Sequence, residues 1–261
     1  MSNVRLKTEQ KRKKLIYMGL NIEPFKQEVH SGDINNYRGR LLFEEAYERR
    51  RVKLKQWQQV ADFYNDNIFG FKQLLLSDFY FRNDLREYLE DIEPATDIQL
   101  SKKIFEYVQD NLTWDGTYST VVPDLESIYR SKTGSVGGIN LILLAMLRHE
   151  GIRANPLLAA SRSNGYILFP TIDGFDNTLV HVQINGQEYI LDASRKFNGF
   201  GQVPLAFVNG DALVVYENYK PELISTRTNI KSKDIVSIEC KLNPEEQSVF
   251  GVTKNLSLIH I

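Results

Sequence analysis

The stretch Thr133–Arg162 reads TGSVGGINLILLAMLRHEGIRANPLLAASR, and it predicts a buried helix followed by a strand. Apolar side chains occupy almost every position from Ile139 to Leu147. A helix that is apolar on all sides cannot lie on a surface, so we expect this one at the centre of the fold. Ser135 can cap the helix, and Gly151 can end it in a left-handed conformation. The apolar run 156–160 that follows indicates a strand.

The pattern G-S-x-x-x-I-N-L-x-L-x-x-M-L-R-x-x-G-I-x-A-x-P-L-L-x-x-S-R in this stretch resembles the transglutaminase-like superfamily, whose core is similar to that of papain-type cysteine proteases. An L-D-A sequence ending at Ala193 adds to the resemblance, which covers about residues 54–215. It is strongest to bacterial members in which this core is one module of a longer secreted chain. It implies a cysteine two residues after Gly134, at a helix N-terminus whose dipole lowers the pKa of a thiol.

The three catalytic positions of the family match Val136, Thr178 and Asp192 in this chain. Valine has no lone pair and cannot be a nucleophile, and the base position holds threonine instead of histidine. The resemblance therefore implies a degenerate triad, and we expect no catalytic residue. Without a histidine to orient, Asp192 is expected to bond the backbone or Thr178, or to pair with Arg162 or Arg195.

Residues near these positions favour structural roles. Ser135 is expected to cap the central helix, and Gly137 to let backbone or a ligand approach the helix start closely. His181 lies three residues past Thr178, so we expect it on the opposite face of a strand and partly exposed.

Cys240 is the single cysteine, which excludes an internal disulfide, and we expect it in the core. No pair of histidines or cysteines has metal-ligand spacing, so we expect no metal and no cofactor.

The order of elements predicts the α+β class, with helices first and an antiparallel sheet afterwards. Thr96 and Gln99 form a capping box at the start of a helix. The dipeptide Asn185-Gly186 between two apolar runs is a strong signal for a type I′ hairpin. We expect a transglutaminase-like, cysteine-protease-like core, in which a buried central helix packs on an antiparallel sheet and the N-terminal part is helical.

Three segments are expected along the chain. Residues 1–53 form a lead-in or linker, and residues 54–216 form the transglutaminase-like domain. Residues 217–261 form a C-terminal extension of strands, which could begin a further module.

The composition is that of an ordinary globular protein, with 42% hydrophobic residues, 25% charged residues and a net charge of −1. This balance favours neither nucleic acid nor a membrane surface as a partner. No apolar run is long enough to span a membrane, and no apolar segment of a signal peptide follows the basic N-terminus. The resemblance nevertheless implies export to the periplasm, and we expect this sequence to be a piece of a longer exported protein.

Three functions are compatible with these observations. The first, which we favour, is a non-catalytic binding or scaffolding module of a larger exported bacterial protein, next to further modules of that chain. Its ligand would be a peptide or glycan held in a residual groove by Trp114, Ser135, Gly137, Thr178, Asp192 and Arg162. The second is a hydrolase or acyltransferase with relocated catalytic residues, such as Ser135 or Asp192. The third is a purely structural domain whose groove is filled by its own side chains or by a neighbouring module.

Overall fold

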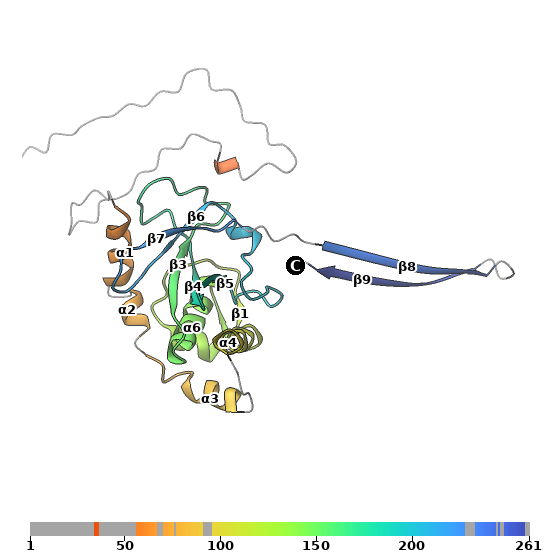
Figure 1. Ribbon diagram of the computed structural model, residues 1–261, viewed down its shortest axis with the longest axis horizontal. Coiled ribbons are helices and arrows are strands. Elements are labelled where there is room, and N and C mark those ends of the chain that lie inside the picture. Colours follow the sequence, from red (N-terminus) through yellow and green to blue (C-terminus); the bar gives the residue numbers. More distant parts are fainter. Residues whose placement is uncertain are drawn as a thin grey trace, which may run out of the picture.

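The computed structural model describes residues 34–36, 56–66, 70–75, 77–90, 96–227, 233–243, 245 and 248–258. Helices dominate the first half of the described chain and strands the second half, so the predicted α+β class is confirmed (Figure 1). Most of the expected lead-in at 1–53 lies outside the described residues. The helices are α1 (Trp57–Asp66), α2 (Phe71–Leu74), α3 (Arg82–Glu90), α4 (Asp97–Asn111), α5 (Leu125–Ser131) and α6 (Val136–His149), with short 3-10 helices η1 (Ile34–Asn36) and η2 (Leu205–Phe207).

A five-stranded antiparallel sheet forms the core, in the order β5-β4-β3-β6-β7. Its strands are β3 (Ala154–Ala159), β4 (Asn177–Ile184), β5 (Gln187–Leu191), β6 (Asp211–Val214) and β7 (Glu222–Ser225). The boundary expected at residue 216 falls between β6 and β7, so the core sheet continues beyond it.

Two smaller pairs of strands complete the described chain. The strands β1 (Thr113–Trp114) and β2 (Thr133–Gly134) form a parallel pair. Because β2 directly precedes α6, this pairing places Trp114 close to the start of that helix. The antiparallel pair β8 (Lys233–Asn243) and β9 (Ser248–Leu258) forms a separate hairpin. Figure 1 shows this hairpin reaching away from the rest of the molecule. None of the described helices is both long and apolar enough to cross a membrane.

Helix α6 is the buried centre that the sequence predicts. Every residue from Val136 to Leu147 is buried. The helix packs on β3 and β4 from one face of the sheet, with α4 beside it (Figure 1). Burial of each large apolar side chain contributes about 1.5–3 kcal/mol, so this helix supplies a large share of the core.

The other face of the sheet is covered as well. A second apolar cluster contains Leu157, Leu179, Val214 and Phe207, and it also takes in Val136 from the start of α6. The strands are therefore buried on both faces, which explains why β4 is buried at every position except Gln183.

Local turn and cap signals fold as the sequence predicts. Asn185 and Gly186 have φ values of 52° and 78°, which is the left-handed conformation that a type I′ turn requires. The Thr96 side chain accepts a hydrogen bond from the Gln99 N–H at 3.4 Å, so it caps α4.

Candidate functional site

The three positions that the sequence resemblance matches to a catalytic triad lie around the N-terminal half of α6. Val136 is the first residue of the helix, Thr178 is near the start of β4, and Asp192 directly follows β5. All three side chains are completely buried. The structure therefore brings these positions to one region, but it encloses them in the core.

Asn140 on α6 connects this region. Its Nδ2 donates to the Thr178 carbonyl and to Asp192 Oδ1, both at 3.1 Å. Its Oδ1 accepts from the Ala193 N–H at 2.9 Å. The resemblance predicts no role for Asn140, although it is the only polar side chain in the buried run 136–147. A lone amide in an apolar helix was the signal that could have identified it, because a buried amide needs partners.

Within the described part of the chain, Asp192 is held by amides and not by an arginine. Besides Asn140, its Oδ1 accepts from the Ser194 N–H at 3.0 Å. Its Oδ2 is buried and has no hydrogen-bond partner among the described residues. Of the partners expected from the sequence, only the backbone is observed.

Within the described chain, neither Arg162 nor Arg195 forms an ion pair with Asp192. The Arg195 guanidinium lies over the Trp114 ring, with 4.8 Å between its Cζ and the ring centroid. Arg162 is fixed through its backbone N–H, which donates to the Ala206 carbonyl at 2.8 Å. Trp114 therefore stacks on Arg195 and packs against the apolar cluster that contains Val136, while the Arg162 backbone is tied to the 3-10 helix η2.

Residues 117–122, which we call the covering loop, lie against the start of α6. The Val136 N–H donates to the Thr117 carbonyl at 3.2 Å. The hydroxyls of Ser119 and Ser135 are 2.7 Å apart, and Thr178 Oγ1 donates to the Thr120 carbonyl at 2.6 Å. Three hydrogen bonds thus hold the covering loop over the triad positions.

Gly137 shows how closely this loop approaches. A Cβ atom at this position would lie 1.9 Å from the Ser119 carbonyl oxygen, a distance that no side chain can accept. The close approach expected at Gly137 is therefore made by the backbone of the chain itself.

Ser135 acts as a helix cap. Its Oγ accepts from the Gly138 N–H at 3.1 Å and shares a second hydrogen bond with Ser119. The residue is 6% exposed. Neither partner is a general base, so the oxygen lacks the activation that a serine nucleophile requires.

His181 and Cys240 differ from the sequence expectations. His181 points to the opposite face from Thr178, as expected, but it is 2% exposed where partial exposure was predicted. Its Nε2 lies 3.5 Å from Glu188 Oε1, which is long for a hydrogen bond. Burial lowers the pKa of His181, while Glu188 and Glu222 oppose this shift.

Cys240 is exposed on β8, and the expected core role is wrong because the described part of this hairpin has no layer packed on it.

Metal ligands do not cluster in the part of the chain that the structure describes. There, no group of three or more histidine, cysteine, aspartate or glutamate side chains could hold a metal ion.

Comparison with known proteins gave two solved structures. No protein-family model and no curated protein matches the chain. A structure described as a "putative protease" from Parabacteroides distasonis aligns with 67% of this chain at 15% identity and a TM-score of 0.47. A second, described as a "putative cysteine protease" from Cytophaga hutchinsonii, aligns with 72% of this chain at 13% identity and a TM-score of 0.35. The chain spans 32% of the first protein and 56% of the second.

Proposed function

We propose that this chain is a non-catalytic domain of the transglutaminase-like type that serves as a scaffold within a larger protein. The observation that carries the proposal is the contact between the Ser119 carbonyl and Gly137. The chain's own backbone occupies the space in front of the helix end where an active relative would place its thiol and its substrate.

The residue types at the three positions support the same conclusion. Val136 packs in the second apolar cluster, and Thr178 uses its hydroxyl to hold the covering loop. Removing a single member of a catalytic triad costs several orders of magnitude in rate, and here the nucleophile and the base are both replaced. Asp192 then serves as a structural acceptor for Asn140 and Ser194.

The covering loop favours scaffolding over a peptide or glycan ligand in the old groove. A ligand there would have to displace three hydrogen bonds, from Val136, Ser135 and Thr178. At about 1 kcal/mol each, this displacement would reduce affinity by roughly 100-fold.

Export of the protein remains a prediction that rests on the resemblance alone.

The first test is activity of the unaltered chain. We expect no acyl transfer and no peptide cleavage with generic peptide and amine substrates. Turnover that survives Cys240→Ser would show that the chemistry has moved to another residue, and it would refute the non-catalytic function.

The second test asks whether the covering loop closes the site. In a Cys240→Ser background we would introduce Val136→Cys and measure the rate at which a soluble reagent labels the thiol. Labelling should be much slower than that of the exposed Cys240 in the unaltered chain. Adding Gly137→Ala should accelerate it, because the new Cβ displaces Ser119.

A thiol buried elsewhere in the core, on α4, provides the matched control. Val108 on α4 is fully buried, so Val108→Cys should label slowly with or without Gly137→Ala. If Val136→Cys reacts as fast as Cys240, the loop does not cover the helix start, and a ligand in the groove becomes the better function.

A further inference from the structure

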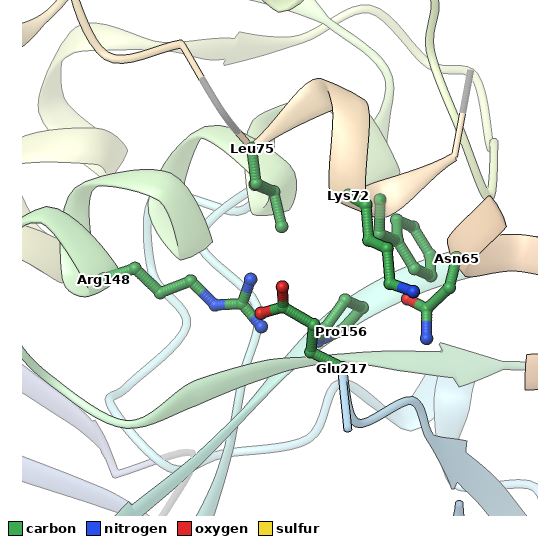
Figure 2. Close-up of a pocket in the computed structure, with 7 residues that line it drawn as sticks. Asn65, Lys72, Leu75, Arg148, Pro156 and Glu217 are labelled. Atoms are coloured by element: carbon green, nitrogen blue, oxygen red, sulfur yellow. The ribbon is translucent and has the colours of Figure 1, made fainter. Parts of the chain in front are cut away.

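A small cavity lies at the opposite end of α6 from the triad positions. Its volume is about 80 Å³, and Asn65, Lys72, Leu75, Arg148, Pro156 and Glu217 contribute to its lining (Figure 2). Arg148 is in the last turn of α6, about 18 Å along the helix from Val136 at a rise of 1.5 Å per residue. The cavity is therefore independent of the covered site.

Arg148 is a partly buried cation with unused hydrogen-bond donors. Its Nε donates to the Ala154 carbonyl at 2.8 Å, which fixes the guanidinium at the cavity wall. Within the described chain it takes part in no ion pair. Burial lowers the pKa of Arg148, and Glu217 opposes the shift, so the field of that carboxylate reaches the cavity. The two terminal nitrogens of a guanidinium can bind a carboxylate side by side.

Glu217 and Asn65 provide acceptors on the other side. Figure 2 shows the Glu217 carboxylate and the Arg148 guanidinium directed toward one another, although no ion pair within the described chain joins them. Asn65 donates through Nδ2 to the Tyr216 carbonyl at 2.9 Å, and its Oδ1 accepts no hydrogen bond from the described residues. Lys72 is already paired with Asp66 at 2.8 Å, so it competes little for a ligand.

We propose that this cavity binds a small zwitterion of α-amino-acid size, such as glycine or alanine. The ligand carboxylate would bond Arg148, and its ammonium group would bond Glu217 and Asn65. Leu75 and Pro156 form an apolar wall that suits a hydrogen atom or a methyl group as the side chain. A volume of about 80 Å³ suits a ligand with few non-hydrogen atoms, so we expect glycine and alanine to fit better than a large amino acid.

The test is a titration of the full ¹⁵N-labelled chain, followed by NMR. Glycine and alanine should shift amide signals around Arg148 and Pro156, whereas leucine should not. Acetate and methylamine each carry only one of the two charges, and glycylglycine separates them, so all three should bind at least tenfold more weakly than glycine.

Two variants make the result specific. Glu217 is exposed, so Glu217→Gln should fold normally while it weakens glycine binding about tenfold or more. Glu222→Gln removes another exposed glutamate outside the cavity and should leave binding unchanged. The proposal is overturned if glycine causes no shifts at high millimolar concentration. It is equally overturned if acetate binds as well as glycine and Glu217→Gln does not weaken either, because the cavity would then hold only water or anions.

Discussion

Replacing Asn140 with alanine should cost about 4 kcal/mol of unfolding free energy. The substitution removes two hydrogen bonds to neutral backbone groups, those of Thr178 and Ala193, at about 1 kcal/mol each. It also removes the bond to the Asp192 carboxylate, for which a charged partner raises the value to about 1.5–3 kcal/mol. All four residues are buried, so water cannot replace the lost partners. A loss of this size is a large fraction of the roughly 5–15 kcal/mol that stabilises a typical domain.

Urea denaturation of the unaltered chain and of two variants would measure this cost. Asn65→Ala is the matched control, because Asn65 is also buried but, among the described residues, makes one hydrogen bond, to the Tyr216 carbonyl. Both variants lose the same side-chain atoms, so their difference isolates the extra hydrogen bonds. Asn140→Ala should be at least about 2 kcal/mol less stable than Asn65→Ala at equal m-values. A difference below about 0.5 kcal/mol would show that Asn140 does not hold α6 to β4 and Asp192.

Three further changes have definite expected outcomes. Gly137→Ala should lower the free energy of unfolding, measured in urea, by about 1–3 kcal/mol, because its Cβ collides with Ser119. It should also expose residues 117–122 to proteolysis, and unchanged cleavage would contradict that packing. Gly186→Ala places a side chain on a residue with a φ of 78°, so it should lower the free energy of unfolding in thermal denaturation by about 1–2 kcal/mol. An unchanged stability would mean that the turn adopts another type. Since burial lowers the pKa of His181, the unfolded chain binds this proton first as pH falls, so stability should decrease below about pH 6.5. His181→Gln should flatten this decrease in denaturation curves between pH 7 and 5, and an equal slope in both proteins would assign the pH dependence to other groups.

The central helix and the first hairpin could be predicted from the sequence because their causes are local. An apolar run without a polar face leaves α6 no position except the interior. Asn185-Gly186 fixes the turn between β4 and β5, since few other residue pairs adopt its two left-handed conformations.

Other features depend on contacts between distant segments, and the sequence does not encode those in a local pattern. The burial of His181 depends on what covers the second face of β4, and Tyr216 lies edge-on to its ring at 6.3 Å. The strand β7 has four residues and is mostly exposed, so its sequence contains no apolar run from which a strand could be predicted. The covering loop has no periodicity, and its path is set by partners on α6 and β4.

We expect the C-terminal hairpin to affect how the protein behaves in concentrated solution. Its two strands are 11 residues each and, within the described chain, pair only with one another, so each leaves an outer edge open to another copy. Apolar side chains along it are more than half exposed, namely Val236, Ile238 and Val252. Pairing of a β8 edge with a β9 edge does not close on itself and would extend into fibres. Glu239 and Lys241 place charge on the β8 strand, and charged side chains on an edge strand oppose this pairing between copies.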